Sequence, residues 1–525
     1  MCLTNCLEKF RRSIFLLKKH GIFFVLTSML ILIFVYLFSN ISSIGLHGDE
    51  SWLGLKGINY LQSGHIDRPY GMNKYTGIFQ AFCNSRVFKY FGFGIIQLRI
   101  TGIVLNFLSI LCLSLFLVRR KLIKEALIFL MLFSQSVLYM NYAKVSWEVC
   151  SFTLFFMVLS AMSLFLFINS SGKKVFLWTF LFLLSTLAGS YNHIIFSSVI
   201  VAAFFALFFW IFVPNSQQYH DIDKMFSIVF VAFINICFLY VFMNNYADIV
   251  WKAHHYFFAF IFFVLLIFES CIIFKIRKII LYLLKFLERF QLSDQFISLI
   301  ALFIFASFLF FHGFSFWDTI VQRIVFIRIF SYEISDFQKI FFIITGSAIF
   351  IYFVYTLFYN LKNKDFMSCF IIFYMGTIVL YTRQESIRYY LILTVLMFLY
   401  IAFNIVKDTA VLKVSLIIFI AANIVLSQCI LWKIESNPER DLHAYHFKFG
   451  RSSTGISAHF MPFEPVIRYC EAAQIGNIST KEKFFIGNNF RFYKEVYPEL
   501  KKYTGNASVE YDFKDYGTGF IIKKE

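Results

Sequence analysis

Charged residues are scarce in this chain. Aspartate, glutamate, lysine and arginine make up 15% of its 525 residues, whereas hydrophobic residues make up 59%. Soluble domains carry roughly 25% charged residues, so the composition excludes an ordinary soluble protein. Apolar runs of near-membrane length recur down most of the chain, and a bilayer core about 30 Å thick needs about 20 apolar residues per helical span. The composition therefore predicts an all-α polytopic membrane protein.

Cysteine motifs are missing as well. The ten cysteines are scattered and form no Cys-x-x-Cys or Cys/His pattern, so neither a zinc site nor a disulfide framework is indicated. Several lie inside apolar runs, where a free cysteine behaves as a small core residue. His47 is not expected to be a metal ligand, because no second histidine stands at helical spacing from it.

Acidic residues are fewer than basic residues in this chain. The chain has 30 acidic and 48 basic residues, which gives a formal net charge of +18. Such an excess can indicate nucleic-acid binding, but here most basic residues lie in short loops between apolar runs, where they set membrane orientation. Membrane lipid, and no nucleic acid, is therefore the expected surrounding.

The apolar runs predict about thirteen transmembrane helices. Basic clusters precede the first run and recur on the same side of later ones, so the amino terminus is expected in the cytoplasm and the carboxyl terminus outside the cell membrane. The predicted spans are residues 21–40, 94–118, 126–140, 149–169, 175–190, 194–213, 225–243, 257–275, 296–314, 340–360, 366–382, 389–406 and 411–432.

Three units follow from this pattern. Residues 1–20 form a cytoplasmic segment, and residues 21–432 form the transmembrane domain, with a long first outer loop over 41–93. The tail 433–525 turns polar and holds four of the six prolines. Its length and composition predict a small α+β extracytoplasmic domain.

A short stretch after the first span, LHGDESWLG at residues 46–54, is the main functional signal. It is expected to place His47, Asp49 and Glu50 at the outer surface, where acidic residues commonly flank a span. The alternative interpretation is a carboxylate base or ligand. A helix over 48–63 would hold Asp49 in its first turn, where the helix dipole favours a charged carboxylate, and such a charge near lipid usually has a function.

The same stretch begins an ordered series of motifs. The acidic pair is followed by a helix ending in Ser-Gly, a proline, an aromatic run ending in Phe-Gly, and Leu-Arg at the next span. These elements are His47 to Leu53, Gln62 to Gly64, Pro69–Tyr70, Phe88 to Gly92 and Leu98–Arg99. The series resembles the first outer loop of the GT-C membrane glycosyltransferases that use polyprenyl-phosphate sugars, such as protein O-mannosyltransferases, lipid A aminoarabinose transferases and rhizobial lipopolysaccharide sugar transferases.

The resemblance implies an inverting glycosyltransferase of the cell envelope. In such enzymes Asp49 would be the catalytic base and Glu50 the neighbour that orients it. A sugar hydroxyl is a poor nucleophile until a base takes its proton, and a leaving phosphate needs a cation rather than an acid. The donor would be a lipid-linked sugar, with no further cofactor required, and the acceptor is left open as a glycan, a lipid or a protein.

Candidate cations for the donor phosphate are expected on the same face. Lys74 occupies the place of a lysine that relatives carry before paired prolines, although Tyr75–Thr76 replaces those prolines here. Arg383 and Arg388 precede a tyrosine-rich apolar run, and a guanidinium matches phosphate geometry. Alternatively, they are ordinary interfacial arginines, and Arg99 either binds phosphate or extends to the interface.

Glu148 is a second acidic candidate, at the top of the fourth predicted span. It would hold the acceptor or pair with a cation near Asp49, or else lie in a solvated helix start. Two other functions stay open for the chain as a whole. One is a non-catalytic carrier or flippase, although few charges lie in midspan, where transport would place them. The other is an oligosaccharide ligase or polymerase.

Overall fold

The computed structural model describes residues 21–39, 41, 46–64, 76–212, 224, 227, 230–238, 294–322, 335–362, 365–380, 390–436, 460–461, 467, 470–480, 485–514 and 517–524. The predicted span 257–275 lies outside these residues, as do residues 225–226, 228–229 and 239–243 of the predicted span 225–243.

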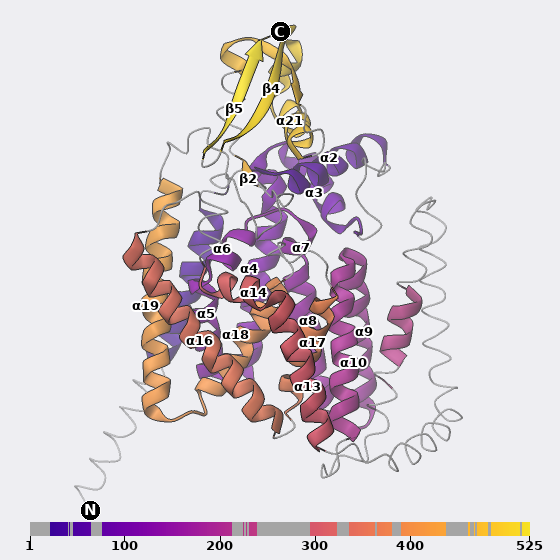
Figure 1. Ribbon diagram of the computed structural model, residues 1–525. Coiled ribbons are helices and arrows are strands. Elements are labelled where there is room, and N and C mark those ends of the chain that lie inside the picture. The colour runs from indigo at the N-terminus through magenta and orange to yellow at the C-terminus, as the bar shows by residue number, and fades with distance from the viewer. Residues whose placement is uncertain are drawn as a thin grey trace, which may run out of the picture.

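Helices dominate the described part of the chain. Seven of them are long and apolar enough to cross a membrane, which agrees with the prediction of a polytopic helical membrane protein; the count of thirteen spans stays a prediction. These seven are Gly21–Phe38, Ile95–Arg119, Glu148–Ile168, Lys173–Asn192, Ser298–Ile320, Asp336–Leu361 and Ala410–Trp432. The bundle in Figure 1 comprises α4 (Ile95–Arg119), α5 (Ile123–Gln135), α6 (Val137–Tyr142), α7 (Glu148–Ser151), α8 (Thr153–Ile168), α9 (Lys173–Asn192), α10 (Ser197–Phe212), α13 (Asp294–Phe308), α14 (Phe314–Ile320), α16 (Asp336–Lys362), α17 (Phe366–Val379), α18 (Leu391–Ile405) and α19 (Ala410–Ser436).

The predicted span 126–140 is wrong as a single helix. It is divided at Ser136, whose backbone is extended, with φ −78° and ψ 101°. The Ser136 hydroxyl accepts a hydrogen bond from the backbone N–H of Tyr139, so it caps a new short helix, α6, in place of the continuing one. The N–H of Val137 is satisfied by the Gln322 side chain at 2.9 Å.

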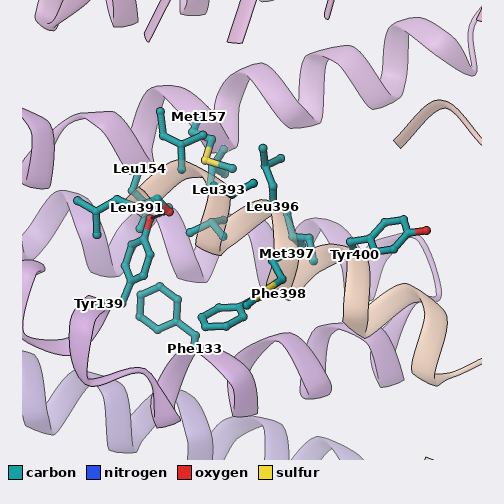
Figure 2. Close-up of a cluster of buried hydrophobic side chains, with 14 of the residues drawn as sticks. Phe133, Tyr139, Leu154, Met157, Leu391, Leu393, Leu396, Met397, Phe398 and Tyr400 are labelled. Carbon is teal, nitrogen blue, oxygen red and sulfur yellow. Dashed lines mark hydrogen bonds between the residues drawn. The ribbon is translucent and has the colours of Figure 1, made fainter. Parts of the chain in front are cut away.

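The core of the bundle surrounds α18. Its residues from Leu391 to Ala402 are all buried, as expected for a helix that is apolar on every side. Figure 2 shows side chains of α18 meeting those of α5, α6 and α8, with Phe133, Tyr139 and Leu154 among them. Lipid tails are themselves apolar, so this core is stabilised by close van der Waals packing rather than by removal from water.

Two helices outside the bundle carry the first loop. They are α2 (Gly48–Ser63) and α3 (Phe79–Phe91), and Figure 1 shows them at the end of the bundle, beneath the C-terminal strands. The helix expected over 48–63 is therefore confirmed. Gly57 permits the two helices to pack closely, because a Cβ there would lie 2.9 Å from the Asn84 Cβ.

The C-terminal tail contains both strands and helices. A three-stranded sheet has the order β3-β4-β5, with β3 parallel to β4 and β4 antiparallel to β5. Its strands are β3 (Ile475–Thr480), β4 (Gly505–Lys514) and β5 (Gly517–Lys524), accompanied by α21 (Phe485–Val496) and the 3-10 helix η4 (Pro498–Lys502). The helix preceding the tail, α19, continues to Ser436, and the limits of a separate domain at 433–525 stay a prediction.

The tail packs against the first loop. Strand β1 (Leu46–His47) pairs antiparallel with β2 (Phe460–Met461) directly before α2 begins. A shared buried cluster joins Ile58 of α2 and Phe88 of α3 to Phe492 of α21. A Cβ at Gly54 would lie 2.6 Å from the Phe492 ring. The two segments, more than half the chain apart in sequence, therefore form one packed unit.

Candidate functional site

The N-terminus of α2 is held by a reciprocal pair of capping bonds. The His47 Nδ1 accepts a hydrogen bond from the backbone N–H of Asp49 at 3.0 Å, and the Glu50 carboxylate accepts one from the N–H of His47 at 3.1 Å. Free N–H groups at a helix start need such partners. Because Nδ1 is an acceptor here, the neutral His47 ring carries its proton on Nε2. That ring stacks on Trp147, with centroids 4.9 Å apart.

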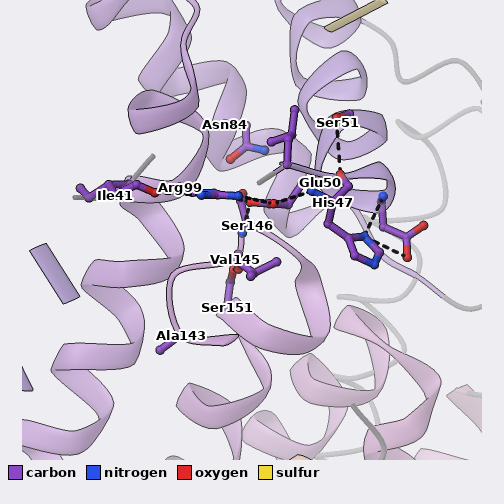
Figure 3. Close-up of polar contacts among 12 residues, drawn as sticks. Ile41, His47, Glu50, Ser51, Asn84, Arg99, Ala143, Val145, Ser146 and Ser151 are labelled. Atoms are coloured by element: carbon purple, nitrogen blue, oxygen red, sulfur yellow. Dashed lines mark hydrogen bonds and ion pairs between the residues drawn. The ribbon is translucent and has the colours of Figure 1, made fainter. Parts of the chain in front are cut away.

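The Glu50 carboxylate accepts hydrogen bonds at both of its oxygens. Both of its oxygens accept from the Arg99 guanidinium, Nε and Nη2 each at 2.8 Å, and Oε1 also accepts from the Ser146 backbone N–H at 2.7 Å. The third Arg99 donor, Nη1, reaches the carbonyl of Ile41 at 2.8 Å. Figure 3 shows this chain of contacts from Ile41 through Arg99 and Glu50 to Ser146. Bidentate pairs of this kind are strong and geometrically specific.

Glu50 and Arg99 thus form a buried ion pair that also bonds to backbone groups of Ile41 and Ser146. Both side chains are 0% exposed, so the Arg99 head does not extend to the interface. The pair joins the start of α2 to α4 and to the turn at Ser146. The phosphate-binding role predicted for Arg99 remains a prediction, and all three of its described donors point to protein oxygens.

Asp49 lies beside this pair, in the first turn of α2. Its Oδ2 is 3.7 Å from the His47 Nδ1, which is too long for a hydrogen bond. The expectation of an acidic pair at the surface was wrong: Asp49 is 3% exposed and Glu50 0%. Glu50 is enclosed by Arg99 of α4 and the turn at Ser146, and Asn489 of the C-terminal tail bonds to Leu46 and Ser51 on either side of Asp49. Contacts this far apart in sequence could not be placed from the first loop alone.

Glu148 is also buried, at 1% exposure, so the interpretation as a solvated helix start is wrong. Its Oε1 accepts a hydrogen bond from Thr76 at 3.2 Å, and its backbone carbonyl accepts one from Asn192 at 2.9 Å. The charge of Glu148 acts on Lys56 of α2, whose pKa is lowered to about 7 by burial while the nearby carboxylate opposes that shift.

The remaining predicted cations lie outside the described residues. Lys74 belongs to 65–75, and Arg383 and Arg388 belong to 381–389. The residue after the second gap, Tyr390, is described: its hydroxyl is 3.0 Å from Nδ1 of the buried His312. Phosphate binding by Lys74, Arg383 and Arg388 therefore stays a prediction.

Asn489 of the C-terminal tail is hydrogen-bonded to the segment that carries Asp49. The Asn489 amide of α21 donates to the Leu46 carbonyl at 3.3 Å, and its oxygen accepts a hydrogen bond from the Ser51 hydroxyl. These bonds span the start of α2 on both sides of Asp49. Burying Asn489, at 1% exposure, makes them stronger than they would be in water.

Sequence reasoning missed three residues of this region. Ser146 acts through its backbone N–H, which carries no side-chain signal. Asn489 is 438 residues from its partner Ser51, so no local pattern connects them. Lys56 did carry a signal, since it stands two helical turns after Asp49 on a partly apolar face.

Metal ligands are not gathered here. In the part of the chain that the structure describes, no group of three or more His, Cys, Asp and Glu side chains is placed to hold a metal ion. Metal independence stays a prediction.

Comparison with known proteins gave structural likenesses only. No family model and no curated protein matches the chain. A crystal structure of ArnT from Cupriavidus metallidurans bound to undecaprenyl phosphate is similar at 10% identity and a TM-score of 0.38, over 94% of this chain and 97% of that one. Its apo form gives 10% and 0.39, over 96% and 98%.

A second protein is similar to the same degree. The archaeal oligosaccharyltransferase AglB from Archaeoglobus fulgidus, in complex with an inhibitory peptide and a dolichol-phosphate, is 12% identical with a TM-score of 0.43. The match covers 93% of this chain and 64% of that one. TM-scores this low do not establish a shared fold.

Proposed function

We propose that this chain is a membrane glycosyltransferase. It moves a sugar from a polyprenyl-phosphate donor to an acceptor hydroxyl at the extracytoplasmic face, with Asp49 as the base. The observation that carries this proposal is the contrast between two adjacent carboxylates, which the same helix start holds in different environments. The first-loop resemblance supplies the donor class.

Glu50 is unsuited to accept a proton. Protonation would remove its charge from the paired Arg99, leaving a buried cation with a neutral partner, which is costly. Asp49 lies instead next to a neutral imidazole, near the positive end of the α2 dipole. Pairs of carboxylates in unlike environments are a common way for a site to separate a structural role from an acid–base role.

The reaction is a single displacement. The acceptor oxygen forms a bond to the anomeric carbon as the bond from that carbon to the phosphate oxygen breaks. The bonding electrons leave with the polyprenyl phosphate, and the acceptor proton passes to an Asp49 oxygen and then to water. The anomeric centre is inverted, and no second carboxylate is needed as a nucleophile.

The test is transfer by Asp49→Asn. Membranes holding the parent or the variant receive a radiolabelled polyprenyl-phosphate sugar and crude cell envelope as acceptor. A positioned base contributes about 10²–10⁴-fold to rate, so transfer should fall by at least 100-fold at equal protein. The matched control is Asp336→Asn, because Asp336 is an exposed carboxylate whose described partner is Lys339.

Two outcomes contradict the proposal. Unchanged transfer by the Asn variant removes Asp49 as the base. Absence of transfer by the parent, combined with binding of the lipid carrier, favours the non-catalytic carrier.

A further inference from the structure

One face of α2 brings Lys56 into line with Asp49. Residues seven apart on a helix lie on one face, about 10 Å apart along the axis, and Trp52 stands between them. The Lys56 Nζ is 3.6 Å from the centre of the Trp52 ring. Lys56 is 3% exposed and Trp52 1%. A cation and an aromatic face thus stand two turns from the proposed base.

These side chains carry donors that have no hydrogen-bond partner among the described residues. A lysine ammonium has three donors, and within the described part of the chain no hydrogen bond to Lys56 Nζ is present; its contacts there are the Trp52 ring and the charge of Glu148. The Trp52 Nε1–H is also buried without an acceptor among the described residues. Native proteins rarely leave buried polar groups unsatisfied, so each such group needs an explanation.

Helix α3, which packs against α2, carries one more acceptor and one more donor without a described hydrogen-bond partner. The Gln80 Nε2 of α3 donates to Asn84 Oδ1 at 2.9 Å and to Ser146 Oγ at 2.7 Å. This leaves Gln80 Oε1 and Asn84 Nδ2 buried and without hydrogen-bond partners among the described residues. A Cβ at Gly57, the residue after Lys56, would lie 2.9 Å from the Asn84 Cβ, so α2 and α3 pack closely at this level.

The charges around this cluster favour an uncharged ligand. Asp49 precedes it on α2, and Glu148 acts on Lys56 from α7. Two carboxylates would repel a phosphate or a carboxylate. A sugar ring presents hydroxyls that both donate and accept, and an apolar face that stacks on an aromatic ring. The mixture of unused donors, one acceptor and an indole matches that chemistry.

We propose that Trp52, Lys56, Gln80 and Asn84 form a subsite that binds the hydroxyls of a sugar ring next to Asp49. This inference deepens the proposed function, on which it rests. The ring belongs either to the donor or to a glycan acceptor, and the two sources are distinguished by which substrate's KM changes.

The decisive variants are Lys56→Met and Trp52→Phe. Methionine keeps the apolar stem of lysine and removes the ammonium; phenylalanine keeps an aromatic ring and removes the N–H. The matched control is Lys89→Met, because Lys89 is an exposed lysine of α3 whose Nζ lies 5.9 Å from the Tyr90 ring centre. Transfer is measured with the radiolabelled polyprenyl-phosphate sugar titrated at fixed envelope acceptor, and then with the reverse titration.

A charged hydrogen bond to substrate is worth more than a neutral one. Lys56→Met should therefore raise the KM of one substrate about 10- to 100-fold, and Trp52→Phe should raise the same KM about 3- to 10-fold. The KM of the other substrate and the behaviour of Lys89→Met should not change. Unchanged KM values for both substrates in Lys56→Met overturn the subsite.

Thermal melting of the purified full chain gives a second readout, which does not depend on activity. Removing a buried ammonium that the fold does not use should leave the melting temperature equal to that of the parent or higher. A melting temperature clearly below both the parent and Lys89→Met shows that Lys56 is a structural cation and overturns the proposal. Should the parent transfer no sugar, the proposed function fails, and the melts still decide the role of Lys56.

Discussion

Replacing Arg99 by methionine removes three charge-assisted hydrogen bonds to described residues of the site. Two of them, each 2.8 Å long, go to Glu50, and the third, also 2.8 Å, goes to the Ile41 carbonyl. The Glu50 carboxylate would keep the backbone N–H groups of Ser146 and His47. Breaking a buried ion pair by removing one partner costs about 3–5 kcal/mol. Since two donors remain on Glu50, we expect a loss near the lower end, about 3 kcal/mol.

A double-mutant cycle isolates the pair. Glu50→Leu and the double variant complete the cycle, and the double variant should lose less stability than the sum of the two single changes. Side chains in direct contact couple by about 0.5–3 kcal/mol, and a fully buried bidentate pair should lie in the upper half of that range. The free energy of unfolding in mixed detergent micelles is the quantity to measure.

The control for this cycle is the exposed pair Lys339–Asp336, whose Nζ and Oδ1 are 3.1 Å apart with side chains 45% and 89% exposed. Its coupling should be no more than about 1 kcal/mol, because exposed ion pairs are screened by solvent. A coupling between Glu50 and Arg99 as small as that of this control would refute the burial of the pair. It would also refute the assignment of Glu50 to positioning rather than proton transfer.

Three further predictions concern the same part of the molecule. Burial lowers the pKa of Lys56 in the folded chain to about 7, from its ordinary value of 10.5. Between these two values the unfolded chain binds more protons than the folded chain, so the stability of the parent rises with pH above pH 7. The increase in melting temperature caused by Lys56→Met should therefore be largest below pH 7 and smaller at pH 9. Gly54→Val places new atoms against the Phe492 ring and should lower the free energy of unfolding by about 1–3 kcal/mol through overpacking, with faster proteolysis in the C-terminal tail. The control is Gly21→Val, which should not affect the tail, because a Cβ at Gly21 meets nothing within 4 Å among the described residues. Burial raises the pKa of the Cys470 thiol to about 11, so native protein at pH 8 should resist iodoacetamide at Cys470 until it unfolds, and rapid labelling of folded protein would contradict the packing of this cluster.

The helices of the bundle could be read from the sequence because each is specified locally. A run of apolar residues that must satisfy its own backbone in lipid can only become a helix, and α4, α9 and α16 begin or end within a few residues of the predicted limits. The failure at Ser136 has a local cause as well. Ser136 caps the next helix and thereby ends α5 inside an apolar run.

The candidate site also has one part that could be predicted from the sequence and another that could not. Asp49 and Glu50 at the start of a helix were predictable, because His47, the acidic pair and the helix pattern are neighbours in sequence. Their burial was not, since it depends on partners outside the first loop, such as the turn at Ser146, 96 residues from Glu50. The different environments of the two carboxylates arise from Arg99, which is 49 residues away from Glu50.

By itself, then, the sequence determined that this is a helical membrane protein whose first loop presents an acidic pair at a helix start. Those properties depend on composition and on residues within a turn or two of one another. Only the tertiary structure decided that Glu50 is paired with Arg99 and that Lys56 is buried, with no hydrogen bond to its Nζ among the described residues. Long-range contacts fix which polar groups share a buried space, and here they place the Arg99 guanidinium against the Glu50 carboxylate.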